Sequence, residues 1–210
     1  MQSVTTSTAD FLPSHLSLKS LRDAAHGCRG CELYKRAIQT VFGHGPASAR
    51  LMLIGEVPGD QEDVQGKPFV GPAGRILDES LEAVGLAREQ VYMTNAVKHF
   101  KWEPRGKRRL HSKPSAREIT ACRPWLEAEI EVVHPQTIVC LGATAAQTLL
   151  GRAFRLTHHL GQLIPSTWAE NIIATYHPSS ILRAPEPTDR DRMKKQLIRD
   201  LKRAAKADKT

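Results

Sequence analysis

The sequence predicts an α/β fold, a three-layer α/β/α sandwich around a central four-stranded parallel sheet. Four short apolar runs have the length of buried strands, and most are followed by a segment whose apolar residues recur at helical spacing. Strands that alternate with helices favour a parallel sheet, because right-handed crossovers place the helices on both of its faces. The chain has 210 residues, 40% hydrophobic and 25% charged, which suits one domain with its own core.

Each predicted element follows from a local pattern. The expected strands cover residues 50–55, 90–97, 137–142 and 171–176, and the expected helices cover residues 74–84, 115–133, 143–150 and 188–204. Ser115 and Glu118 have the spacing of a capping box, which marks the start of the second helix. Pro124 is expected to kink that helix, and Gly151 is expected to end the next one.

The two ends of the chain differ from its middle. Residues 1–15 are rich in Ser and Thr without periodicity, so we expect a disordered N-terminal segment, and residues 205–210 are expected to fray. A single domain then covers residues 16–204. No run approaches the ~18 apolar residues of a membrane span, and no secretory leader is recognisable. These patterns favour a cytoplasmic protein with no membrane partner, and the absence of any pattern for an extended apolar interface favours a monomer.

The charge of the chain is concentrated in one segment. The formal net charge is +8 and the pI is about 9.5, which makes a polyanion such as nucleic acid a plausible partner. Residues 98–117 contain eight Lys or Arg and one Glu, and Lys107, Arg108 and Arg109 are candidate phosphate contacts. Phe100 and Trp102 in the same segment favour stacking on single-stranded or flipped bases. A solvated basic loop is the alternative interpretation.

Four cysteines form a candidate metal centre. Cys28 and Cys31 are arranged as C-x-x-C, and Cys122 and Cys140 are separated by seventeen residues. Four thiolates suit tetrahedral zinc or an iron–sulfur cluster, and sequence spacing does not choose between them. Alternatively, Cys122 and Cys140 are core residues of a helix and a strand.

Polar side chains follow three of the predicted strands. Glu56 follows the first strand, Asn95 lies at the end of the second, and His177 follows the fourth. Open α/β sheets bind ligands beyond the carboxyl ends of their strands, so these groups are expected to converge. The glycine-rich residues 55–74 do not form a phosphate-binding loop, because Gly66-Lys67 is followed by Pro68 where Ser or Thr is required. Phe69 in this stretch is a candidate exposed aromatic residue.

His111 ends the basic run Lys-Arg-Arg-Leu-His at residues 107–111. Neighbouring cations make an imidazole harder to protonate, so at neutral pH this ring would serve better as a nucleophile or a base.

Five motifs in one order carry a resemblance to a known family. They are GEVPGD (55–60), GKPFVGPAG (66–74), TNAVKHF (94–100), GKRRLH (106–111) and HPSS (177–180). From residue 28 to residue 201 the chain resembles the uracil-DNA glycosylase superfamily, and specifically its iron–sulfur X-type branch, whose members become covalently attached to uracil-containing DNA. The basic motif that ends in His111 points to this branch. Val57 departs from the pattern, which has Gln in the X-type branch and Ala in relatives that turn over.

The resemblance implies a uracil-DNA glycosylase-like fold and a set of site roles. It implies a base-excising enzyme that acts on uracil-containing DNA, single-stranded and double-stranded, and is then trapped through His111 at C1′ of the abasic sugar. The implied catalytic residues are His111, Glu56 and His177, and the implied substrate-binding residues are Asn95, Phe69, Gly55 and Ser179. The implied cofactor is a structural 4Fe-4S cluster bound by Cys28, Cys31, Cys122 and Cys140.

Two other functions remain open on the sequence. A turnover glycosylase would release free abasic DNA, with the basic segment only gripping the strand. A non-catalytic iron–sulfur module would bind DNA without releasing a base, although phosphate binding alone requires none of Glu56, Asn95 and His177.

Overall fold

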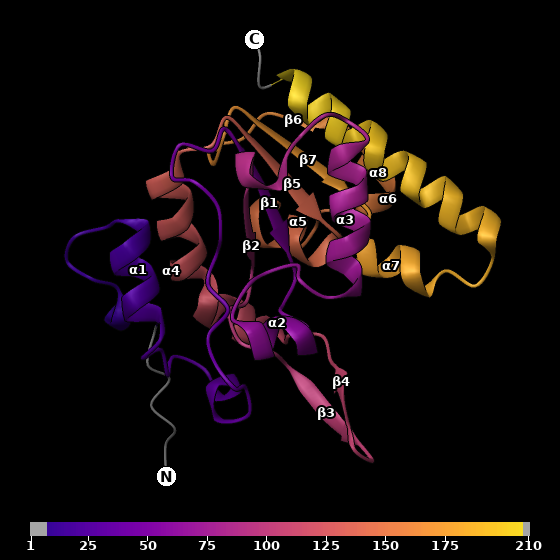
Figure 1. The fold of residues 1–210 in the computed structure, drawn as a ribbon. Helices are drawn as coiled ribbons and strands as arrows, with labels where there is room; N and C mark the ends of the chain where they lie inside the picture. Colours follow the sequence, from indigo (N-terminus) through magenta and orange to yellow (C-terminus); the bar gives the residue numbers. More distant parts are fainter. Residues whose placement is uncertain (1–7, 208–210) are drawn as a thin grey trace.

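A mostly parallel five-stranded sheet forms the centre of the protein (Figure 1). The computed structural model describes residues 8–207, so predictions for residues 1–7 and 208–210 lie outside the described residues. The strand order is β2 (Tyr92–Asn95), β1 (Leu51–Gly55), β5 (Thr137–Leu141), β7 (Asn171–Thr175) and β6 (Leu163–Ile164). The first four strands are parallel, which confirms the predicted sheet, and β6 pairs antiparallel with β7 at one edge.

Alternating strand residues divide the core between the two faces of the sheet. Met52 and Ile54 of β1 pack on the side of α4 (Ala116–Val133) and α5 (Ala143–Leu150). Leu51 and Leu53 pack on the opposite side, which is covered by α3 (Pro72–Glu82), α7 (Pro178–Arg183) and α8 (Pro187–Ala207). Because successive strand residues point to opposite faces and both faces are apolar, helices must cover both. The predicted three-layer sandwich is confirmed.

A third apolar cluster joins the N-terminal part of the chain to α4. Here α1 (Leu18–Ala25) packs beside α4, and Leu21 and Trp125 are fully buried between them. Thr8 of the 3-10 helix η1 (Thr8–Phe11) is also fully buried and donates a hydrogen bond to the Ala121 carbonyl. Residues 8–11, which fall in the segment expected to be disordered, are therefore ordered.

Several short elements complete the fold. They are η2 (Glu32–Lys35), α2 (Asp60–Gln65), η3 (Arg88–Gln90), α6 (Leu156–His159) and a hairpin of β3 (Trp102–Arg105) and β4 (Arg108–His111). The capping box of α4 is present, because the Ser115 side chain accepts a hydrogen bond from the Glu118 backbone N–H. No helix within residues 8–207 is both long and apolar enough to cross a membrane.

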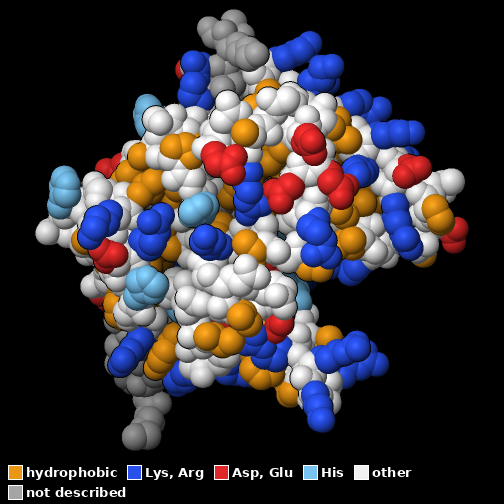
Figure 2. Space-filling view, viewed as in Figure 1, with side chains coloured by type: hydrophobic (Ala, Val, Ile, Leu, Met, Phe, Trp, Pro, Cys, Tyr) orange, Lys and Arg blue, Asp and Glu red, His pale blue; other side chains and the backbone are white. Residues whose placement is uncertain are grey.

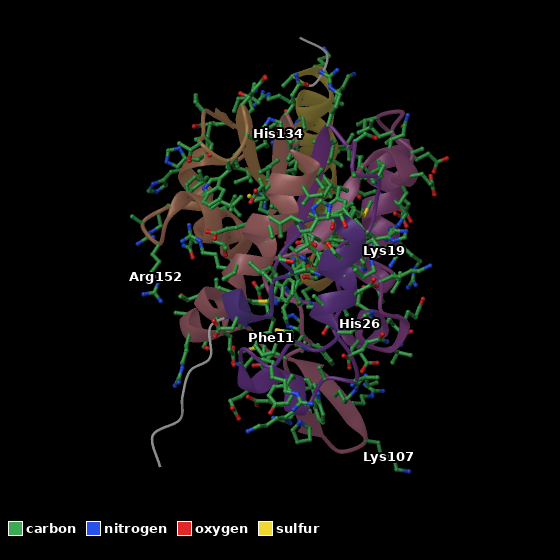
Figure 3. All side chains as sticks on the ribbon, turned by 90° about the vertical axis from the view of Figure 1, so that its left-hand side faces the viewer. Phe11, Lys19, His26, Lys107, His134 and Arg152 are labelled. Atoms are coloured by element: carbon green, nitrogen blue, oxygen red, sulfur yellow. The ribbon has the colours of Figure 1, made fainter. Side chains whose placement is uncertain are left out.

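The β3–β4 hairpin projects from the body of the protein below α2 (Figure 1). It occupies the basic segment that was expected to be a loop. Gly106 adopts a left-handed backbone at the turn, with φ of 59°, and Lys107 beside it extends into solvent at the tip (Figure 3). His111 is the last residue of β4 and pairs with Trp102 at the base of the hairpin. The hairpin thus carries His111 back toward the ends of the sheet strands.

Candidate active site

A cavity of about 340 Å³ lies beyond the carboxyl ends of the sheet strands. Figure 2 shows the surface hollowed between the projecting hairpin and the body of the protein. Five of the predicted site residues line this cavity, namely Phe69, Asn95, His111, His177 and Ser179. They come from the loop before α3, the end of β2, the end of β4 and the start of α7, so the fold collects them from four separate parts of the sequence.

Phe69 forms part of the cavity wall and is not an exposed aromatic residue. Only 5% of its surface is accessible, and its ring centroid lies 6.2 Å from that of His177. Its backbone is left-handed, with φ of 54°, a conformation that costs about 1–3 kcal/mol in a residue other than glycine. The Glu62 carboxylate stabilises this turn, because it accepts hydrogen bonds from the backbone N–H groups of Val70 and Gly71 at 3.0 and 2.8 Å.

Asn95 places a side-chain amide in the same cavity. It is the last residue of β2 and is 3% exposed. A methyl group at Gly55 on the neighbouring strand would overlap Asn95 Oδ1 and lie 2.7 Å from Phe69 Cζ. Gly55 therefore contributes by having no side chain, because the lack of a Cβ leaves room for the Asn95 amide and the Phe69 ring.

His177 is held as a neutral hydrogen-bond donor. Its Nδ1 accepts a hydrogen bond from the Ser179 backbone N–H at 3.1 Å and lies 2.7 Å from Ser179 Oγ. A backbone N–H only donates, so Nδ1 carries the lone pair and the proton of the neutral ring is on Nε2. Burial, with smaller contributions from Arg183 and His111, lowers the pKa of His177 to about 4. At neutral pH the uncharged ring therefore presents an Nε2–H group.

His111 is also held in its neutral form. Much of its surface is open to solvent, yet the surrounding protein atoms desolvate the ring enough to lower its pKa below the usual value of 6.5. The Glu56 carboxylate opposes this shift, and Arg183 reinforces it. The His111 ring centroid lies 6.4 Å from that of Phe100. A neutral imidazole retains a lone pair, which nucleophilic attack requires.

Glu56 differs from the other predicted catalytic residues in its contacts. It does not line the cavity, and its Oε2 accepts a hydrogen bond from Thr144 Oγ1 in α5 at 2.6 Å. Its charge nevertheless acts on His111, although no described hydrogen bond joins the two side chains. Thr144 in turn lines a second cavity of about 450 Å³ between α4 and α5.

The basic segment divides into two kinds of residue. Lys107 and Arg108 are exposed at the hairpin tip, which suits contact with phosphates. Arg109 turns back to the body, where its guanidinium binds the carboxylates of Asp60 and Asp63 at 2.7 and 2.6 Å. The expectation that Arg109 is a free DNA contact is therefore corrected.

The two aromatic residues of this segment are engaged within the protein. Phe100 is 1% exposed, so it offers no face to a DNA base. The Trp102 indole N–H donates a hydrogen bond to the Arg36 carbonyl at 2.9 Å. The prediction that Phe100 stacks on a DNA base is therefore wrong. The Trp102 indole is bound to another part of the same chain.

Three of the four cysteines gather in one place. Cys28 and Cys122 are buried in the cluster between α1 and α4, and Cys31 packs against it. Trp125 Nε1–H donates to Cys28 Sγ and the Lys98 backbone N–H donates to Cys122 Sγ, each at 3.2 Å. Such N–H···S bonds are a feature of iron–sulfur sites, where they tune the cluster.

Cys140 lies apart from the other three cysteines. It is in β5, between Ile54 of β1 and Ala174 of β7, and packs in the core beneath α4 and α5. Burial alone raises the pKa of its thiol to about 12, with no contribution from another cysteine. Cys140 therefore packs in a different part of the core from the other three cysteines, and this position favours the core-residue alternative. Within residues 8–207, no three His, Cys, Asp or Glu side chains are arranged as a preformed metal site.

Three residues near these sites were not singled out from the sequence. Arg183 lines the main cavity and lowers the pKa values of both His111 and His177. Its position shortly after HPSS, on the helix that this motif begins, was the available signal. Thr144 gave no local signal. His99 is buried directly after Lys98, and its Nε2 lies 3.1 Å from Thr40 Oγ1.

The fold and the cavity define an α/β/α sandwich whose strand ends form a cavity lined by an aromatic ring, an amide and two imidazoles. Residues 42–202 match the family model of the uracil DNA glycosylase superfamily, and the chain belongs to this superfamily. It is 38% identical over 157 residues to a type-4 uracil-DNA glycosylase of Thermotoga maritima, covering 74% of this chain and 78% of the relative. A type-4 uracil-DNA glycosylase of Archaeoglobus fulgidus is 36% identical over 166 residues, covering 76% of this chain and 80% of the relative.

Similarity extends to a second type within the superfamily. A type-5 uracil-DNA glycosylase of Thermus thermophilus is 30% identical over 158 residues, covering 66% of this chain and 68% of the relative.

Proposed function

We propose that this protein excises uracil from DNA and is then trapped through His111 as a covalent adduct with the abasic sugar. The observation that carries the proposal is that a neutral His111, borne on the hairpin, shares one cavity with Phe69, Asn95 and His177. The three other side chains supply what recognition of a flipped pyrimidine requires, and His111 adds a nucleophile.

Recognition of the base follows from the chemistry of the cavity wall. Phe69 stacks on the flipped ring, a contact worth ~1–3 kcal/mol per base. The Asn95 amide donates to uracil O4 and accepts from N3–H, whereas cytosine presents the opposite pattern at these two positions. The neutral His177 directs its Nε2–H toward O2, where negative charge collects as the base departs.

Cleavage then separates charge between the sugar and the base. The C1′–N1 bond breaks, its electron pair leaves with uracil, and the sugar becomes an oxocarbenium ion. His177 stabilises the uracil anion, and the Glu56 carboxylate stabilises the positive charge nearby. This division of roles requires His177 to remain neutral, which its pKa of about 4 secures at neutral pH.

Trapping consumes the cation. The lone pair of one His111 ring nitrogen forms a bond to C1′, and the ring becomes an alkylated imidazolium. The proton on its other nitrogen is released to solvent, while the uracil anion gains a proton, so charge balances. The Glu56 charge stabilises the imidazolium while it forms. Once its proton is lost, the neutral alkylated imidazole is a poor leaving group, so each molecule reacts once.

The cations at the hairpin tip bind the DNA. Lys107 and Arg108 extend from the body beside the cavity and suit the phosphates that flank a flipped nucleotide in single-stranded or double-stranded DNA. Each such contact is expected to contribute about one unit to the salt dependence of binding.

We also propose a structural 4Fe-4S cluster, with a revised set of ligands. Cys28, Cys31 and Cys122 supply three thiolates from one cluster of side chains, and two of these sulfurs accept N–H bonds. His99 lies close to two of these cysteines. It directly follows Lys98, whose backbone N–H donates to Cys122 Sγ. Its Nε2 lies 3.1 Å from Thr40 Oγ1, and the Ala25 carbonyl accepts hydrogen bonds from both the Thr40 hydroxyl and the Cys28 backbone N–H. Imidazole replaces thiolate in some iron–sulfur centres, so His99 takes the fourth place.

The cluster is separate from the chemistry of base release, because cleavage of a glycosidic bond transfers no electron. Its proposed part is to tie the N-terminal segment to α4. Iron and sulfide analysis of purified variants tests the ligand set: Cys140→Ser should retain iron, and Cys122→Ser and His99→Ala should lose it. Retention of full iron by His99→Ala and loss by Cys140→Ser would contradict it.

The direct test of function is a denaturing gel with uracil-containing single-stranded DNA. We expect a protein–DNA species that survives boiling in detergent, and its loss in His111→Gly with uracil release retained. A matched oligonucleotide with thymine in place of uracil is the control and should give no such species. Abasic product in molar excess over wild-type protein, without adduct, would instead indicate a turnover glycosylase. Binding without release of uracil would indicate a non-catalytic module.

A further inference from the structure

The hairpin that carries His111 is attached to α2 through one guanidinium. Asp60 and Asp63 are three residues apart in α2 and therefore lie on one side of this helix. Arg109 of β4 binds both, with Nε–Asp60 Oδ1 at 2.7 Å and Nη1–Asp63 Oδ2 at 2.6 Å. Asp63 is fully buried and also accepts a hydrogen bond from the Ile38 backbone N–H at 3.0 Å. Its carboxylate is thus fixed independently of the hairpin.

A second set of contacts holds the base of the hairpin. The guanidinium groups of Arg36 and Arg109 lie 4.4 and 5.7 Å from the centroid of the Trp102 ring. The Arg109 guanidinium also lies 5.3 Å from the centroid of the buried Phe100 ring. Arg109 therefore contacts α2, the first residue of β3 and the segment that leads into β3.

The hairpin needs such an anchor because it belongs to no larger sheet. Its two strands pair only with each other, and an isolated two-stranded hairpin is marginally stable in water. Arg109 and His111 are two positions apart in β4, so their side chains project from the same face of the hairpin. Fixing the Arg109 guanidinium on α2 therefore fixes the direction in which the His111 imidazole projects.

The same helix holds the base-binding loop. Glu62 of α2 accepts the backbone N–H bonds that stabilise the turn at Phe69. Val57, where we expect Gln in the X-type branch and Ala in relatives that turn over, packs in the apolar cluster between α1 and α4 and offers no polar group to the hairpin. Helix α2 therefore contacts both the hairpin that carries His111 and the turn that carries Phe69.

We propose that Arg109, Asp60 and Asp63 form a latch that positions His111 at C1′ and thereby sets the balance between covalent trapping and hydrolysis. This inference rests on the proposed function. With the latch closed, the imidazole captures the oxocarbenium ion. With the latch open, a water oxygen forms the bond to C1′ and loses a proton to solvent, so that free abasic DNA and uracil are the products. Arg109 is a positioning residue and does not touch the substrate.

The test compares variants that remove the latch from either side. In single-turnover reactions with uracil-containing single-stranded DNA, we expect the ratio of adduct to free abasic product to fall tenfold or more in Arg109→Gln and in Asp60→Asn/Asp63→Asn. The two carboxylate changes raise the net positive charge and remove no cation from the protein, so DNA binding should not weaken. Asp23→Asn, which breaks the exposed ion pair with Lys19 on α1, is the matched control and should leave the ratio unchanged.

The opposite result identifies Arg109 as a phosphate contact. If Arg109→Gln weakens DNA binding and lowers its salt dependence while Asp60→Asn/Asp63→Asn keeps the wild-type ratio, the latch is refuted. Thermal melting monitors folding, and Asp60→Asn alone is the milder variant, because Asp60 is half exposed whereas Asp63 is buried.

A second measurement keeps the latch separate from the trapping chemistry. Amide hydrogen exchange of residues 102–111 without DNA should be faster in the carboxylate variants than in wild type. Unchanged exchange overturns the latch even if adducts form. Faster exchange supports it even if the wild-type protein releases uracil without forming an adduct, a result that would overturn the trapping proposal alone.

Discussion

A single methyl group at residue 55 should disable base recognition while leaving the fold in place. In Gly55→Ala the new Cβ would overlap Asn95 Oδ1 and lie 2.7 Å from Phe69 Cζ. Neither neighbour yields easily, because Asn95 is 3% exposed and Phe69 is held in a left-handed turn. The methyl group therefore displaces the amide, the ring or both from the positions that contact the base.

The size of the effect follows from the interactions with the base that the methyl group disrupts. A stacked base contributes ~1–3 kcal/mol, and a paired set of hydrogen bonds to a base edge contributes a similar amount. A loss of about 3 kcal/mol in the transition state slows uracil release by roughly 100-fold. Overpacking of the strand end costs about 1–3 kcal/mol of folding stability, which lowers Tm by several degrees and leaves the protein folded at 25 °C.

Single-turnover uracil release from single-stranded DNA, with thermal melting alongside, measures both effects. Gly27→Ala is the matched control, because a Cβ there meets only the Ala24 carbonyl oxygen at an ordinary 3.6 Å. A Gly55→Ala protein that releases uracil at the wild-type rate would show that Asn95 and Phe69 do not frame the base.

Three further results are expected. Glu129→Gln should destabilise the protein by about 3–5 kcal/mol in thermal or denaturant unfolding, because it leaves the fully buried Lys98 ammonium without its ion-pair partner; a wild-type midpoint would contradict this. The rate of adduct formation should hold between pH 7.5 and 6.5 and decline only below pH 6.5, since the lowered pKa keeps most of the His111 population neutral at that pH; a decline centred above pH 6.5 would reverse the sign of the shift. Thr144→Val removes a charged hydrogen bond from Glu56 and should slow uracil release by about tenfold in single-turnover assays; an unchanged rate would remove Thr144 from the mechanism.

The sheet and its flanking helices could be predicted because their signals are local. Apolar runs such as residues 137–142 and the capping box at Ser115 depend on neighbouring residues only. The β3–β4 hairpin could not be predicted in this way, because its strands are charged, contain Pro104 and are mostly exposed. Strand β6 spans two residues, which is too short for any periodicity.

The errors at the candidate site concern contacts between distant parts of the chain. Arg109 was grouped with exposed cations because its partners, Asp60 and Asp63, lie more than forty positions earlier in the sequence. Cys140 was grouped with the other cysteines by count, although its place in a continuous apolar strand already indicated a core position. The convergence of Asn95 and His177 was predicted correctly, because the strand ends of a parallel sheet meet at one edge.

The most direct test of the central claim is peptide mapping of the product after the protein meets uracil-containing DNA. We predict that mass spectrometry locates an abasic-sugar adduct on a ring nitrogen of His111, in one-to-one ratio with released uracil. Released uracil in large excess over protein, with every peptide that contains His111 unmodified, would contradict the account.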